Sequence, residues 1–247
     1  MAEQIEHLKT LYSENQEREK KKLEIIADPI KKPFHILSFK GINTIFFLHK
    51  AFIEKDFHAS KAFLYKVAMV NSYYYETLNG EIFNVVDTFT YPLLSDSSNL
   101  IDRYLHYEKT EHPDSFSTYF GKAIQSVLKD DSQALQLNIE GLKKWSKKGW
   151  AKQYAGIATA LEGFLDKNKS TIEKGLQEIV ALHNKQEQPA IVKDYINLEA
   201  TALAKLAWRK GMEVIIGNNL VPHELLPVEE LSVYEGYDFF NELQNSL

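Results

Sequence analysis

The chain contains no cysteine, which excludes disulfide bonds, thiol nucleophiles and thiolate metal ligands. Its first 22 residues have no apolar stretch ahead of a small-residue cleavage site, so we expect no secretory signal. No run approaches the roughly 18 apolar residues that a membrane span needs. These absences favour a cytoplasmic protein, and we expect no membrane partner.

Motifs for catalysis and cofactor binding are also absent. The chain has no phosphate-binding P-loop, no G-x-G-x-x-G, no G-x-S-x-G and no H-E-x-x-H. The run that starts at His223 and Glu224 begins like the last motif, but Pro227 stands where the second histidine ligand is required. Glu108 and His112 have helical spacing, yet Pro113 ends a helix there and one such pair is common on surfaces. We therefore predict no catalytic, cofactor-binding or metal-binding residues, and a protein that is not an enzyme.

Basic residues are missing from the end of the chain. After Lys210 there is no Lys or Arg, and the last 37 residues carry a formal charge of −7 in a protein whose total is −5. Clustered like charge creates a field that a basic surface can complement, and aromatic rings among the carboxylates can add contact area. This pattern predicts a docking surface for a basic partner, made of Glu224, Glu229, Glu230, Tyr234, Glu235, Tyr237 and Asp238. The alternative is a solvated acidic terminus, or one that folds back onto lysines such as Lys143, Lys144, Lys147 and Lys148.

The overall balance argues against nucleic acid as a partner. A pI near 5.9 does not provide the dense basic face that phosphate neutralisation needs. Lys143 to Lys152 form one basic patch, for which a solvated helix face is the favoured interpretation.

Apolar residues recur at spacings of three and four through most of the chain, which predicts an all-α fold. Proline after Asp28 and after Lys32 should interrupt the first helix. We expect a central helix over residues 59–78, a buried helix over 191–208 in which Glu199 is hydrogen-bonded internally, an extended piece at 212–216 and a last helix near 232–243.

A 37-residue repeat indicates the architecture. Leu135, Ile139 and Leu142 are matched 37 positions later by Ile172, Leu176 and Ile179, and both copies contain a polar turn before a serine placed to cap the next helix. Two αα-hairpins with this period predict a solenoid-like stack of antiparallel hairpins, although two copies can also arise by coincidence. We predict one compact domain over residues 1–247, with an N-terminal helix and linker (1–33), a helical stack (34–210) and a short extended segment followed by an acidic helix (211–247).

Two stretches carry a resemblance to a known family. The run from Tyr195 to Val214 reads YINLEATALAKLAWRKGMEV and is followed at Leu220 by LVPHELL. Together with ALEGFLDKN from Ala160, they resemble the immunity protein 49 family over roughly residues 120 to 227. The resemblance implies an all-α protein encoded beside a bacterial polymorphic toxin, which binds the cognate toxin stoichiometrically and neutralises it.

Three functions remain open at this point. The first is an immunity protein whose cognate toxin is basic, since many such toxins act on nucleic acid. The second is a helical-repeat adaptor or regulator that binds a peptide or another protein. The third is an enzyme with a dispersed site that a single sequence does not reveal. The sequence does not indicate the oligomeric state.

Overall fold

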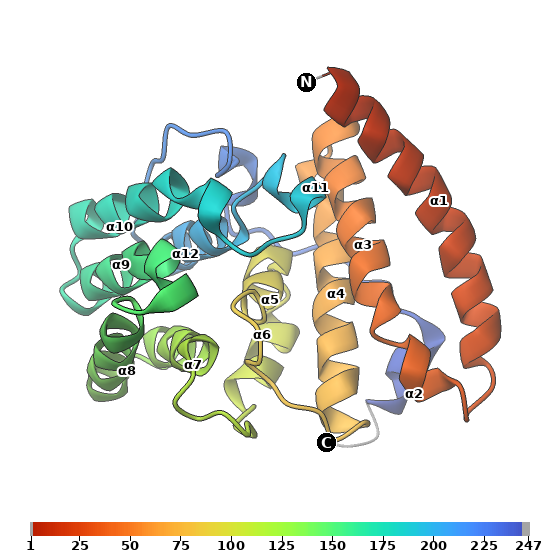
Figure 1. Cartoon of the computed structure of the whole chain (residues 1–247), viewed down its shortest axis with the longest axis horizontal. Helices are drawn as coiled ribbons and strands as arrows, with labels where there is room; N and C mark the ends of the chain where they lie inside the picture. The colour runs from red at the N-terminus through yellow and green to blue at the C-terminus, as the bar shows by residue number, and fades with distance from the viewer. Residues whose placement is uncertain (1, 244–247) are drawn as a thin grey trace. The chain divides into compact units, whose positions relative to one another are not determined.

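The computed structural model describes residues 2–243, which form helices, short helical turns and irregular segments, with no strand in that range (Figure 1). The all-α prediction is confirmed. The chain divides into two compact units. Unit 1 contains Met1–Glu81, Ser95–Leu100 and Glu229–Leu247, and unit 2 contains Ile82–Leu94 and Ile101–Val228. The organisation as one domain stays a prediction.

Unit 1 is built on three long helices, drawn in red and orange in Figure 1. They are α1 (Ala2–Ile26), α3 (Ser38–Leu48) and α4 (Phe57–Glu76), with the short α2 (Lys32–His35) before α3 and a π-helical turn over His49–Ile53. Helix α3 packs against both α1 and α4. Helix α4 is the central helix expected from the sequence, and the Asp56 side chain caps it by accepting a hydrogen bond from the Ala59 amide at 2.9 Å.

One helical stretch of unit 1, over Lys32–Ile53, is long and apolar enough to cross a membrane by length and composition alone. Just over half of its apolar window, 56%, is buried inside the fold. Phe39, Ile42, Phe47 and Leu48 are fully buried, so the apolar face of α3 contributes to the core of unit 1.

Unit 2 is a stack of antiparallel helices. Helix α5 (Thr90–Ser95) and helix α6 (Ser98–Leu105) span the points where the chain passes between the units. The stack itself contains α7 (Phe116–Leu128), α8 (Ser132–Trp145), α9 (Ala155–Leu165), α10 (Lys169–Ala181), the short α11 (Ala190–Lys193) and α12 (Leu198–Arg209). Each of α7 to α10 packs on the next, and α12 packs on α9 and α10.

The 37-residue correspondence is visible in the stack. Leu135 and Leu142 on α8, and Ile172 and Ile179 on α10, are all buried, as predicted. The turns before these helices also match, because Asp130 and Lys167 both have a left-handed backbone, with φ of 54° and 51°. The hairpin repeat is therefore a repeat of backbone geometry as well as of apolar spacing.

The caps of the repeated helices differ from the prediction. Asp131 caps α8 and Asn168 caps α10, accepting hydrogen bonds from Ala134 N at 2.9 Å and Thr171 N at 3.2 Å. Ser132 instead begins α8. Asp and Asn cap as well as Ser does, and the left-handed residue before each of them fixes where the chain turns.

Helices α9 and α10 approach each other through glycines. A side chain at Gly175 would collide with the backbone of Ala160, and one at Gly156 would lie 2.5 Å from the Gly175 carbonyl oxygen. The glycines therefore set the closest contact between α9 and α10.

Two predicted helices are wrong. The helix expected over 191–208 is divided, because Asn197 turns the chain and caps α12 by accepting a hydrogen bond from the Ala200 amide at 2.9 Å. The helix expected near 232–243 is an irregular segment that ends in a 3₁₀ turn over Asp238–Glu242. Side chains of this segment bond to the rest of unit 1, and these contacts outweigh its weak helical pattern.

Candidate functional site

Six of the seven predicted docking residues lie on one segment of unit 1, residues 229–242, which we call the acidic strap. Glu224 belongs to unit 2, in a 3₁₀ turn over His223–Leu225. The structure therefore groups Glu229, Glu230, Tyr234, Glu235, Tyr237 and Asp238 and leaves Glu224 apart from them.

A buried ion pair holds the start of the acidic strap. The Lys61 ammonium lies 2.7 Å from the Asp96 carboxylate, and both side chains are almost completely buried. Lys61 Nζ also donates a hydrogen bond to the Glu229 carbonyl at 2.9 Å, while the Glu229 amide donates to Asp96 Oδ2 at 3.2 Å. The backbone amide and the backbone carbonyl of Glu229 are thus both hydrogen-bonded to the Lys61–Asp96 pair, which fixes where the strap begins.

Two tyrosines anchor the middle of the strap. The Tyr234 hydroxyl donates to the Ser95 carbonyl at 2.7 Å, and its ring packs on Tyr65 with centroids 4.8 Å apart. The Tyr237 hydroxyl bonds to the Glu19 carboxylate and accepts from Asn43 Nδ2 at 2.9 Å. Burial, with the Glu19 carboxylate beside it, raises the pKa of Tyr237 above its ordinary value.

The end of the strap is fixed by Glu242. Its carboxylate pairs with Lys32 and accepts a hydrogen bond from the Tyr73 hydroxyl at 2.6 Å. Hydrogen bonds from Lys32 and Tyr73 keep the pKa of Glu242 below its ordinary value. Phe239 and Phe240 are buried beside this pair, with Phe239 against Tyr73 and Phe39.

The other carboxylates of the strap face solvent. Glu229, Glu230, Glu235 and Asp238 are all exposed, and Val233 between them is 68% exposed. Glu230 accepts a hydrogen bond from the Ser98 amide, and Glu229 lies 3.7 Å from His58. Within residues 2–243, Glu235 and Asp238 make no side-chain hydrogen bond or ion pair. The strap therefore presents an acidic surface on an immobilised backbone. Direct contact of its tyrosines with a partner stays a prediction.

Of the lysines expected as internal partners of this segment, Lys143 and Lys144 are on α8, and Lys147 and Lys148 follow its end. Lys143 pairs with Glu162 of α9. The charged groups of the strap bond instead to Lys32 and His58 of unit 1, so the segment folds back in part, but onto different cations from those expected.

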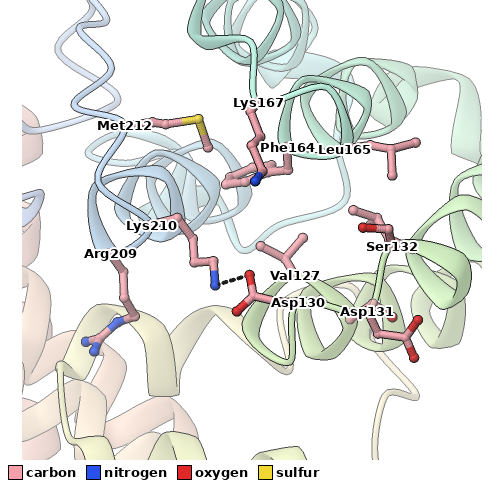
Figure 2. A pocket seen from close by; sticks show the side chains of 12 residues that line it. Val127, Asp130, Asp131, Ser132, Phe164, Leu165, Lys167, Arg209, Lys210 and Met212 are labelled. Carbon is pink, nitrogen blue, oxygen red and sulfur yellow. Dashed lines mark hydrogen bonds and ion pairs between the residues drawn. The ribbon is translucent and has the colours of Figure 1, made fainter.

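Unit 2 contains a pocket of about 570 Å³ between the repeated turns (Figure 2). The C-terminal ends of α7, α9 and α12 meet there. Val127, Phe164 and Met212 supply apolar lining, and Asp130 pairs with Lys210 at 2.6 Å across it. The Lys210 hydrogen bond lowers the pKa of Asp130. Cations at helix C-termini also offset the helix dipoles, which gives Lys167 and Lys210 a structural role.

Buried polar residues around α12 form a network that sequence reasoning did not detect. Asn197 Nδ2 donates to His183 Nδ1 at 2.9 Å and to Gln186 Oε1 at 2.7 Å. His183 Nε2 lies 2.8 Å from the Lys193 carbonyl oxygen and so carries the ring proton. Since both ring nitrogens are engaged, His183 holds chain segments together and is not placed as a base.

Glu199 and Lys205 are ionisable residues that are buried on α12. Glu199 accepts a hydrogen bond from Gln188, which confirms its predicted internal bond, and burial raises its pKa to about 8, with Asp87 adding to the effect. Lys205 donates to the Leu225 and Pro227 carbonyls at 2.9 and 2.5 Å. Lys205 is therefore buried under the segment that follows α12.

Across residues 2–243, no group of three or more His, Asp or Glu side chains is arranged to hold a metal ion. Comparison of this chain with protein-family models, with curated protein sequences and with solved structures finds no match.

Proposed function

We propose that this protein is an immunity protein, which binds a cognate bacterial toxin stoichiometrically in the cytoplasm and neutralises it without catalysis. The observation that carries the proposal is the acidic strap, whose exposed carboxylates sit on a backbone held by the Lys61–Asp96 pair and by Tyr234 and Tyr237. The resemblance of residues 120 to 227 to an immunity family supports the same function.

The strap has physical properties that suit inhibition of a basic protein. Its carboxylates create a negative field that accelerates encounter with a positive surface. Because the backbone is already immobilised, binding does not have to order the segment, and less free energy is lost on association. Exposed Val233 adds an apolar contact among the charges.

The test is co-purification with the product of the adjacent toxin gene, followed by association kinetics. A strap variant carries the amides of four exposed carboxylates: Glu229→Gln, Glu230→Gln, Glu235→Gln and Asp238→Asn. The matched control makes the same charge change on exposed positions of α1: Glu3→Gln, Glu6→Gln, Glu14→Gln and Glu17→Gln.

We expect the strap variant to associate at least about tenfold more slowly at low salt, with a flatter salt dependence, while the control stays near the wild-type rate. Equal association rates for wild type, strap variant and control would refute the role of the strap. Failure to bind the toxin at all would refute the proposed function.

The pocket of unit 2 favours a second candidate, a helical-repeat adaptor or regulator that binds a peptide. Stacked hairpins often use surfaces between repeats for such binding. In that case Lys167→Glu, in the pocket, should lower affinity for the partner protein, whereas the strap variant should not.

A further inference from the structure

The connection between α1 and α3 exposes large apolar side chains. We call residues 27–37 the hairpin tip. Ile30 is 79% exposed, Phe34 82% and Leu37 45%. Lys31, Ile36 and Leu37 have helical backbone angles, so the spacing of four and three residues places the exposed side chains on one side of the chain. The neighbouring Ile36 is fully buried and already supplies the core contact of this segment. A group of side chains this exposed and apolar indicates an interaction site.

The same hairpin is basic. Residues 18–40 contain seven Lys and Arg and three Asp and Glu, a formal charge of +4 in a protein of −5. Lys22 Nζ lies 2.7 Å from His35 Nδ1, which ties the end of α1 to α2 and brings the basic final turns of α1 to the apolar tip. Lys20, Lys21 and Lys31 are exposed. Lys20 pairs with Glu17 at 2.9 Å and Lys31 with Asp28 at 3.5 Å, and both are weak surface pairs that lipid phosphates can replace.

We propose that the hairpin tip binds peripherally to an anionic phospholipid surface. Ile30, Phe34 and Leu37 enter the headgroup region, and Lys20, Lys21 and Lys31 contact lipid phosphates. Either interaction alone gives weak, reversible binding, but an apolar insertion combined with a polybasic patch gives stable attachment. A protein helix would dock in a groove, and neither of the two pockets lined by residues 126–212 and 177–218 includes a residue of the hairpin tip. Side chains about four-fifths exposed project from the surface, which fits a deformable interface.

This inference revises the expectation of no membrane partner. That expectation rested on the absence of a spanning run, and peripheral binding needs none. It is independent of the proposed neutralisation of a toxin, because the acidic strap and the hairpin tip are different segments with opposite charge.

The test is co-sedimentation of the full-length protein with phosphatidylcholine vesicles, with and without phosphatidylserine. Two variants are compared with wild type. Ile30→Ser with Phe34→Ser removes the apolar insertion, and Lys20→Gln with Lys21→Gln and Lys31→Gln removes the basic contacts. The control is Leu137→Ser with Ile215→Ser, which removes two other apolar side chains, both 66% exposed.

We expect retention on vesicles that contain phosphatidylserine, weakened by salt, and at least about tenfold weaker binding for each tip variant but not for the control. Thermal unfolding verifies that every variant is folded, as substitutions at exposed positions should allow. No retention on phosphatidylserine vesicles, or equal retention of wild type and both tip variants, would overturn the proposal. So would tip variants that bind vesicles normally but lose the toxin, since the tip would then be a protein-binding site.

Discussion

Replacing Glu199 with glutamine tests whether the buried Glu199 carboxyl group is protonated in the folded protein. Glu199 lies in the first turn of α12, accepts a hydrogen bond from Gln188 and has its pKa raised from 4.5 to about 8, mainly by burial. The neutral acid and glutamine have nearly the same shape and can accept the same hydrogen bond. The substitution therefore removes the titration and preserves most of the packing.

The sign of the effect follows from the direction of the pKa shift. Between pH 4.5 and about 8 the folded protein keeps a proton that the unfolded chain releases, so the contribution of Glu199 to stability falls as pH rises through this window. Each pKa unit corresponds to about 1.4 kcal/mol, so the full window is worth about 5 kcal/mol. Glu199→Gln does not titrate. Relative to wild type, its free energy of unfolding should be similar near pH 4.5 and greater by about 5 kcal/mol above pH 8.

Denaturant unfolding across this pH range measures the difference directly, and Glu140→Gln on the exposed face of α8 is the control. The control should differ from wild type by a small amount that does not change between pH 5 and 8. A Glu199→Gln difference that is equally independent of pH would show that the carboxyl group is ionised in the folded protein, and the reasoning from burial would be refuted.

Two further substitutions test packing within each unit, both measured by denaturant unfolding. Lys61→Met removes the cation paired with the buried Asp96 carboxylate in the ion pair described above and should destabilise by about 3 to 5 kcal/mol. The same change at exposed Lys144 should cost less than about 0.5 kcal/mol, and equal effects would contradict the buried ion pair. Gly175→Ala should destabilise by about 1 to 3 kcal/mol, because the added methyl group meets the backbone of α9. The control Gly41→Ala lies in an exposed helical position with open space and should stabilise by about 0.5 to 1 kcal/mol. Unchanged stability of Gly175→Ala would refute the close α9–α10 contact.

Apolar periodicity predicts most of the helices because each helix buries one or more faces. Helix α4 and the repeated pair α8 and α10 show this, since Leu64, Leu135 and Ile172 are all buried at the spacing that the sequence displays. The division at Asn197 could also be predicted in principle. Asn directly before an apolar helical run is a capping signal, but the apolar run on either side of Asn197 obscures it.

The contacts of the buried lysines could not be predicted from sequence. Lys61 bonds to the carbonyl of Glu229, 168 residues away, and Lys205 bonds to carbonyls 20 and 22 residues later. These backbone acceptors carry no residue-type signal, and the Asp96 carboxylate that also pairs with Lys61 is 35 positions away in the sequence. A lysine on an otherwise buried helix face is the only signal, and it indicates that some acceptor exists without indicating which one.

The acidic strap was predictable in composition but not in conformation. Charge clustering identified Glu229 to Asp238 as a surface, and the exposed carboxylates agree with that interpretation. Helical spacing gave the wrong backbone, because Tyr234 and Tyr237 direct their hydroxyls to Ser95, Asn43 and Glu19. Tyr234 and Tyr237, which the sequence suggests as contacts for a partner, instead attach the strap to the rest of unit 1.

The two buried lysines give a physical reason for regarding the acidic strap as more than a trailing end. Lys205 fixes the chain at Leu225 and Pro227 within unit 2, and Lys61 fixes it at Glu229 within unit 1. Burying an ammonium group is unfavourable unless its hydrogen bonds are satisfied, so each lysine stabilises the fold only while this part of the backbone is in place. A solvated acidic terminus would need neither lysine. The fold therefore couples its own stability to the position of the strap, which keeps four exposed carboxylates in a fixed arrangement before any partner arrives.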